Sequence, residues 1–174
     1  MVKLQKLTAS LQVSITQVLA RIIERTEEIA LDQIPPLKHS PATKGGAITK
    51  AATEVGLTVG AKFLVAFTQS GDSARRMSRL RSPIPMLALT PDTGTFNRLA
   101  LSWGVESLLT PVVNHTDEMV MQVDSILINS KRVNLGDLVL IVAGSPPGIP
   151  GSINAMRVHK IGDAVGGVAP AYRK

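Results

Sequence analysis

From residue 42 onward, short apolar runs alternate with segments in which apolar side chains recur at helical spacing. The apolar runs cover residues 62–67, 86–90, 107–113, 138–143 and 155–161, and the helical segments cover 47–55, 72–81, 92–102 and 116–129. Such alternation predicts a parallel sheet with helices on both faces. The link between the last two runs is too short for a helical crossover, so the last strand is expected to lie antiparallel at an edge. The predicted fold class is therefore α/β, a three-layer sandwich around a mostly parallel five-stranded sheet.

The first part of the chain has a different pattern. Between residues 4 and 30 apolar side chains are spaced three or four apart, which predicts an amphipathic helix beginning near Thr8 or Ser10. Pro35 and Pro36 end this pattern. We therefore expect an N-terminal helix in residues 1–34, a linker in 35–41, an α/β domain in 42–162, which opens with a short helix closed by Gly56, and a tail in 163–174.

Composition narrows the classes of protein that are possible. Hydrophobic residues make up 44% and charged residues 18%, as in a globular protein. No apolar run approaches the roughly 20 residues that span a bilayer, and the N-terminus lacks a signal-peptide pattern. There is no cysteine, and the three histidines are far apart, so no disulfide or metal site is expected. We interpret the chain as a cytoplasmic protein that does not associate with membranes.

The net charge of +6 favours anionic partners. The basic residues are nevertheless dispersed, apart from a cluster at 75–81, and aromatic residues make up only 3% of the chain. A nucleic-acid surface with interleaved basic and aromatic side chains is therefore not expected.

The cluster belongs to the most informative stretch, residues 62–81. An apolar strand is followed by a polar loop and then by a helix with four arginines, and the loop consists of Thr68, Gln69, Ser70, Gly71, Asp72 and Ser73. Strand, polar loop and basic helix are typical of a phosphate site, because the helix start offers free N–H groups and partial positive charge. The alternative is that Ser70, Asp72 or Ser73 only caps the helix. Neither of the common nucleotide-loop motifs is present.

A second loop is expected beside the first. Ligands of parallel α/β sheets bind at the carboxyl ends of the strands. The glycine- and proline-rich loop 144–152 follows strand 138–143, as loop 68–73 follows strand 62–67. The two loops are therefore predicted to meet at one rim of the sheet and to form a single anion pocket.

Four segments resemble the C-terminal domain of bacterial pyruvate kinases. They are AFTQSGDSARR (66–76), PIPMLALT (83–90), RLALSWGV (98–105) and GDLVLIVAGSPPGIPGSINAMRV (136–158). The resemblance runs from about Pro41 to Gly162 in family order, and residues 10–34 resemble the last helix of the catalytic barrel.

The resemblance implies a regulatory domain of the glycolytic enzyme that converts phosphoenolpyruvate and ADP to pyruvate and ATP. In the family, the magnesium and potassium sites and the catalytic lysine belong to the barrel, which has no counterpart in this sequence. Phosphoryl transfer needs a metal and a cationic clamp. The chain is therefore expected to be inactive alone, with no catalytic residue, metal site or cofactor of its own.

The resemblance also implies the site residues. A phosphate is expected on the strand-to-helix loop, under a covering loop before the last strand; the residues are Thr68, Gln69, Ser70, Gly71 and Ser73, with Pro147, Gly148, Ile149, Pro150 and Gly151. Enzymes activated by fructose 1,6-bisphosphate hold the second phosphate with a Trp and an Arg, which correspond here to His115 and Gln122. Asp72 adds a negative charge beside the loop. We therefore expect a monophosphate, either a hexose phosphate or a nucleoside monophosphate, rather than the bisphosphate. The alternative is that the pocket binds only inorganic phosphate or sulfate, or nothing.

Partner surfaces follow from the same resemblance. A homo-oligomer is expected to form through the last strand, 156–161, because an exposed edge strand can pair with its symmetry mate. The N-terminal helix is expected to keep an exposed apolar stripe. Three functions compete at this point: an effector-binding and oligomerisation domain of pyruvate kinase, a stand-alone phospho-ligand-binding protein of the same fold, and a purely structural oligomerisation module.

Overall fold

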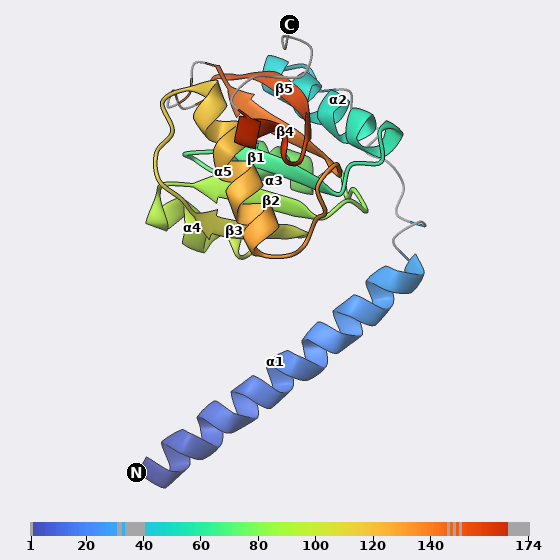
Figure 1. Cartoon of the computed structure of the whole chain (residues 1–174). Coiled ribbons are helices and arrows are strands. Elements are labelled where there is room, and N and C mark those ends of the chain that lie inside the picture. The colour runs from blue at the N-terminus through green and yellow to red at the C-terminus, as the bar shows by residue number, and fades with distance from the viewer. Residues whose placement is uncertain are drawn as a thin grey trace, which may run out of the picture. The chain divides into compact units, whose positions relative to one another are not determined.

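The computed structural model describes residues 2–30, 33, 41–145, 147, 149 and 151–166 (Figure 1). The chain divides into two compact units, Met1–Lys38 and His39–Lys174. The first unit contains helix α1 (Val2–Ala30). The predicted start near Thr8 or Ser10 is wrong, because residues 2–9 contain no helix breaker and α1 already begins at Val2. The largest described apolar side chains of α1 are exposed within this unit, and they include Ile15, Val18, Ile22 and Ile29.

The second unit alternates helices and strands as the sequence predicts. Its elements are α2 (Lys44–Thr58), β1 (Phe63–Phe67), α3 (Asp72–Ser78), β2 (Met86–Thr90), α4 (Thr93–Leu99), β3 (Val105–Leu109), α5 (Thr116–Asn129), β4 (Leu138–Gly144), β5 (Ile153–Lys160) and the 3₁₀ turn η2 (Asp163–Gly166). The five strands form one sheet in the order β3-β2-β1-β4-β5. All neighbours are parallel except β4 and β5, which are antiparallel, so the predicted α/β fold with an antiparallel last edge strand is confirmed.

Alternation along the strands builds two cores. Leu64 and Ala66 of β1 pack into a cluster with buried side chains of α2, α3 and α4. Phe63 and Val65, which point to the opposite face, pack into a second cluster with α5. Figure 1 accordingly shows α5 on the near face of the sheet and α3 behind it. Because the central strands are buried on both faces, their sequences are continuous apolar runs.

The ends of α2 differ from the prediction of 47–55. Thr43 caps the helix, with its Oγ1 accepting the N–H of Gly46 at 3.2 Å, so α2 begins at Lys44. Gly56 is buried inside the helix and does not end it. The helix ends instead before Gly60, whose φ of +67° is the left-handed conformation that favours glycine.

Other elements also begin or end at residues that differ from the predicted ones. Helices α3 and α4 are shorter than predicted. Strand β3 begins at Val105, two residues before the predicted 107, and stops at Leu109, because its register with β2 ends at the pair Thr90 and Leu109. Strand β5 begins at Ile153, which pairs with Gly144. The early end of β3 matters for function, since it leaves residues 110–113 in a loop.

A buried carboxylate joins the last elements. Asp124 of α5 accepts a hydrogen bond at 2.7 Å from Nε2 of His159 on β5, and both side chains are almost completely buried. Its second oxygen accepts the backbone N–H groups of Gly162 and Ala164 at 3.1 and 3.3 Å. Asp124 therefore fastens β5 and the turn after it to α5.

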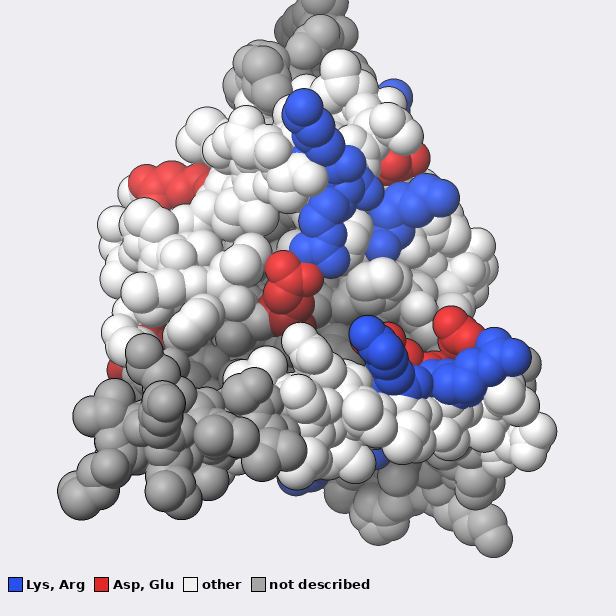
Figure 2. Space-filling model, turned by 90° about the horizontal axis from the view of Figure 1, so that it is seen from below, with Lys and Arg blue, Asp and Glu red and all other residues white. Residues whose placement is uncertain are grey.

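Two further findings concern surfaces. Within the described residues no helix is long and apolar enough to cross a membrane, and no three His, Asp or Glu side chains are grouped as a metal site would require. Figure 2 shows Lys and Arg side chains gathered on one face of the molecule, in separate groups with acidic side chains beside them. On the face shown, positive charge is interrupted by negative charge.

Candidate functional site

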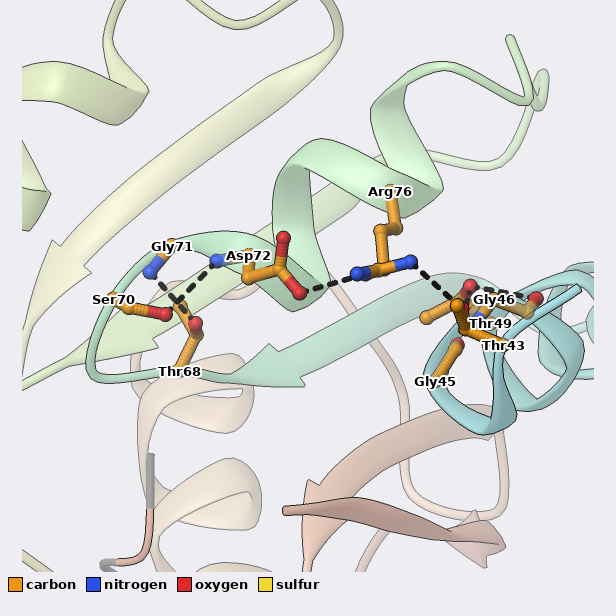
Figure 3. Close-up of polar contacts among 9 residues, drawn as sticks. All are labelled: Thr43, Gly45, Gly46, Thr49, Thr68, Ser70, Gly71, Asp72 and Arg76. Atoms are coloured by element: carbon orange, nitrogen blue, oxygen red, sulfur yellow. Dashed lines mark hydrogen bonds and ion pairs between the residues drawn. The ribbon is translucent and has the colours of Figure 1, made fainter. Parts of the chain in front are cut away.

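The loop after β1 is a tight turn. Thr68 continues the sheet, with its N–H donating to the Leu89 carbonyl at 3.0 Å. Its Oγ1 accepts the N–H of Gly71 at 2.9 Å (Figure 3). Gly71 has φ +81°, the left-handed conformation, and it is the N-cap residue of α3. The loop 68–71 is thus closed on itself before the helix begins.

The start of α3 bears on the alternative that a loop side chain only caps the helix. No side chain caps the helix from the N-cap position, which is Gly71. Ser70 Oγ accepts the N–H of Asp72 only at 3.4 Å, and Ser73 is buried in the first turn. The interpretation of Asp72 or Ser73 as the capping side chain is therefore wrong, and Ser70 makes at most a long contact of this kind.

The acidic charge beside the loop is paired. Arg76 Nε donates to Asp72 Oδ2 at 2.6 Å, and Arg76 NH1 donates to Thr43 Oγ1 at 3.1 Å (Figure 3). Since Thr43 caps α2, this arginine connects α3 to the start of α2. The negative charge of Asp72 is therefore offset by Arg76, which makes these contacts instead of lining the pocket described next.

A pocket with a cavity volume of about 70 Å³ lies at the carboxyl rim of the sheet. Loops after all four parallel strands contribute to it. Its described lining has no charged side chain; the lining residues are Phe67, Thr68, Gln69, Ser70, Leu89, Pro91, Thr110, Pro111, Val112, Val113, Met119, Gly144, Pro147, Ile149, Gly151, Ser152 and Ile153. Hydroxyl, amide and backbone groups therefore share the pocket with a substantial apolar wall.

The predicted site residues fall into three groups. Residues of both predicted loops line this pocket; they are Thr68, Gln69, Ser70, Pro147, Ile149 and Gly151. Gly71 and Ser73 do not line it, because Gly71 packs against α4 and Ser73 is buried in α3. Gly148 and Pro150 lie outside the described residues.

Sequence reasoning missed one side of the pocket. Residues 110–113 and Met119 line it but were not predicted as site residues. The signal was available, because loops after parallel strands meet at one rim and residues 110–113 follow β3. Extending the predicted third strand to residue 113 concealed this signal. Ser152 belongs to the predicted loop 144–152 but was not named as a site residue.

The positions matched to the second phosphate site carry no fixed positive charge. His115 is the exposed N-cap residue of α5. Gln122 donates from Nε2 to the Pro111 carbonyl at 3.3 Å, while its Oε1 is buried without a hydrogen-bond partner. Neither residue lines the pocket, although Pro111 does.

Helix α4 supports loop 68–71 through Thr95. The buried Thr95 donates from Oγ1 to the carbonyl of Gln69 at 2.7 Å and accepts from Arg98 NH2 at 2.8 Å. Asp92 caps α4 by accepting the N–H of Thr95 at 2.6 Å. Hydrogen bonding from Thr95, with the charge of Arg98 nearby, lowers the pKa of Asp92 below its ordinary value of 3.8.

The fold and the pocket define a class of protein, an open and mostly parallel α/β domain with its pocket at the carboxyl rim. The chain belongs to the pyruvate kinase family, since the family model described as pyruvate kinase, alpha/beta domain, matches residues 46–159. The pyruvate kinase of Mycobacterium tuberculosis is 48% identical over 145 residues, which cover 83% of this chain and 30% of that protein. The pyruvate kinase of Corynebacterium glutamicum is 40% identical over 150 residues, covering 86% and 31%.

Solved structures agree on the fold. A Cryptosporidium parvum pyruvate kinase in complex with ADP superimposes with a TM-score of 0.64 at 24% identity, covering 71% of this chain and 25% of that one. This chain spans about 30% of the length of the pyruvate kinases of Mycobacterium tuberculosis and Corynebacterium glutamicum.

Proposed function

We propose that this chain is the effector-binding and oligomerisation part of a pyruvate kinase, and that it binds a phosphorylated small molecule without transforming it. The observation that supports this proposal is the rim pocket in which loop 68–70 meets residues 147–153. As the resemblance implies, we leave catalysis to the barrel of the family and not to this α/β domain.

The pocket suits a phosphate group in chemistry and size. Thr68 and Ser70 offer hydroxyl donors and Gln69 offers an amide, whereas the Ser152 hydroxyl already donates to the Ile149 carbonyl at 2.7 Å. A buried water needs roughly 10–15 Å³ of such space, so about 70 Å³ holds roughly five to seven water-sized atoms, which is room for the five heavy atoms of one phosphate group.

A monophosphate fits better than a bisphosphate. The described lining contains no Lys or Arg that would hold a second phosphate, and Gln122 and His115 stand where an Arg and a Trp would be needed. Losing a charged hydrogen-bonding group costs about 1.5–3 kcal/mol of binding free energy. We expect a hexose monophosphate or a nucleoside monophosphate, with its body against the apolar wall.

The proposed oligomer uses β5. This strand is one of the two edges of the sheet, it is eight residues long, and Met156, Arg157 and Val158 are exposed on it. A long edge strand with exposed apolar side chains favours pairing with a second copy around a two-fold axis.

Thermal unfolding with glucose 6-phosphate, AMP and fructose 1,6-bisphosphate tests the proposed ligand. A ligand at 100 times its Kd adds about 2.7 kcal/mol of stability, or roughly 10 °C for a domain of this size. We expect a shift with one of the two monophosphates that is larger than the shift with the bisphosphate.

Two serine variants assign that shift to the pocket. Ser70→Ala removes a lining hydroxyl and should reduce the shift, whereas Ser125→Ala removes an exposed hydroxyl on α5 and should leave it unchanged. Absence of any shift in the parent chain would favour a purely structural module. A shift that survives Ser70→Ala undiminished would contradict the proposed loop.

A further inference from the structure

The pocket lacks charged side chains, but a cation is connected to it through a chain of hydrogen bonds. Arg98 NH2 donates to Thr95 Oγ1 at 2.8 Å, and Thr95 Oγ1 donates to the Gln69 carbonyl at 2.7 Å. Gln69 and Ser70 both line the pocket, whereas Thr95 and Arg98 do not. The connection crosses 26 residues of sequence, from loop 68–71 to α4.

The direction of each hydrogen bond follows from chemistry. A guanidinium group only donates, so the Thr95 hydroxyl must accept from Arg98. A hydroxyl has one proton, and the acceptor 2.7 Å away is the Gln69 carbonyl oxygen. The side chain of Thr95 is buried, and its N–H is held by Asp92 at 2.6 Å, so its orientation is fixed.

The Gln69 carbonyl and the Ser70 N–H belong to one peptide group. A hydrogen bond accepted at the carbonyl polarises that group and strengthens its N–H as a donor. The cation at the far end of the chain increases this effect, although the carboxylate of Asp92, 3.9 Å from Arg98, offsets part of its charge.

We infer that Thr95 is a positioning residue for the proposed anion site and that Arg98 acts on the site through it. The two residues hold the Gln69–Ser70 peptide group in place and polarise it toward an anionic ligand. This inference rests on the proposed function, since it describes how an uncharged pocket would bind an anion.

Binding of inorganic phosphate and of glucose 6-phosphate to the full chain, followed by NMR titration, tests this inference. Thr95→Val keeps the shape of the side chain and removes its hydroxyl, so affinity should fall about three- to tenfold, the effect of one hydrogen bond. Arg98→Gln should weaken binding in the same direction. Thr95→Ser restores the hydroxyl and should stay within about twofold of the parent.

Arg79→Gln is the matched control for charge. Arg79 is the exposed C-cap residue of α3, and among the described residues its side chain makes no hydrogen bond or ion pair. Its loss should leave affinity within about twofold. An equal loss of affinity in Arg79→Gln and Arg98→Gln would mean that Arg98 acts only through the net charge of the protein. That result would overturn its role in the hydrogen-bond chain.

The amide nitrogen shift of Ser70, measured without ligand, provides an independent readout. It responds to hydrogen bonding at the Gln69 carbonyl and should move in Thr95→Val but not in Thr95→Ser. An unchanged shift in Thr95→Val would mean that the hydroxyl donates to Asp92 instead, and the inference would be wrong. Unchanged phosphate affinity in a folded Thr95→Val, or an equal loss in Thr95→Ser, would also overturn it.

Failure of the proposed function gives a different result. In that case the parent chain binds neither phosphate nor glucose 6-phosphate, while the Ser70 shift still depends on Thr95. That outcome contradicts an anion site and therefore a positioning role for it, and it leaves the hydrogen-bond chain as a property of the fold.

Discussion

Replacing Asp124 by Ala should destabilise the α/β domain more than any surface substitution. In the structure Asp124 accepts three hydrogen bonds, from His159 Nε2 and from the N–H groups of Gly162 and Ala164. The alanine variant leaves these three donors without their acceptor. Among the described residues, Asp124 is the only side-chain carboxylate that connects α5 with the turn after β5. The alanine variant removes this connection.

The magnitude follows from burial. Each buried donor left unsatisfied costs about 1–3 kcal/mol, but the sum over three donors is an upper limit, because Gly162 and Ala164 are only half-buried and water can reach them. Removing one partner of a buried pair costs about 3–5 kcal/mol. We expect a loss of about 3–5 kcal/mol, which lowers the melting temperature by roughly 10–20 °C.

Urea denaturation measures this loss. Trp103 is the sole tryptophan and lies in the α/β domain, with its ring centroid 4.5 Å from the guanidinium carbon of Arg81, so its fluorescence reports unfolding of that domain. Asp117→Ala is the matched control, because it removes an exposed carboxylate from the first turn of the same helix and should cost less than about 1 kcal/mol.

A double-mutant cycle isolates the pair. His159→Ala should cost clearly less in the Asp124→Ala background than in the parent chain, because the partner has already been lost. Equal costs in the two backgrounds, or a loss in Asp124→Ala no larger than in Asp117→Ala, would refute the reasoning from burial.

Three further outcomes are expected. The pKa of Asp92 is lowered in the folded chain, so its capping contribution should be present above pH 3.8 and lost as the pH falls through the folded value; the stability difference between the parent and Asp92→Ala should shrink accordingly in acid denaturation curves. Gly71→Ala should cost about 1–3 kcal/mol in urea denaturation, and more than Gly104→Ala, because both have positive φ but only the Cβ at Gly71 meets neighbours, at 3.1–3.3 Å. Arg76→Met should cost less than about 1 kcal/mol by the same measurement, since its pair with Asp72 is about one third exposed.

The sheet was predictable from local sequence because its signal is local. Apolar runs such as 138–143 and the helices between them give strand number and direction, and the short link before Ile153 gives the antiparallel edge. Boundaries were less predictable, because they depend on partners. Strand β3 ends where its pairing with β2 ends. Pro111, which has no N–H to donate, marks the neighbourhood of that end in the sequence, but the pairing partner decides the exact residue.

The buried acid shows a middle case. Asp124 lies four residues after Val120 and three before Leu127, so the helical spacing alone puts it on the buried face of α5. A buried carboxylate needs hydrogen-bond donors, so the sequence predicts that Asp124 has donor partners but does not identify them. Its actual partners follow 35 to 40 residues later, and no local pattern connects His159 or Gly162 with it.

The candidate site was predictable from the sequence in one respect and not in another. Topology brings the loops after β1 and β4 to one rim, so Ser70 and Ile149 were predictable as neighbours. The support of the loop was not predictable, because Thr95 reaches Gln69 only once α4 has packed against β2 and β3. A sequence of this kind therefore predicts which backbone segments form a pocket, while the hydrogen-bonding capacity of that pocket depends on buried side chains of other elements. Substitutions at such supporting positions are consequently the sharpest test of the site, since they change the strength of its donors without changing the residues that touch a ligand.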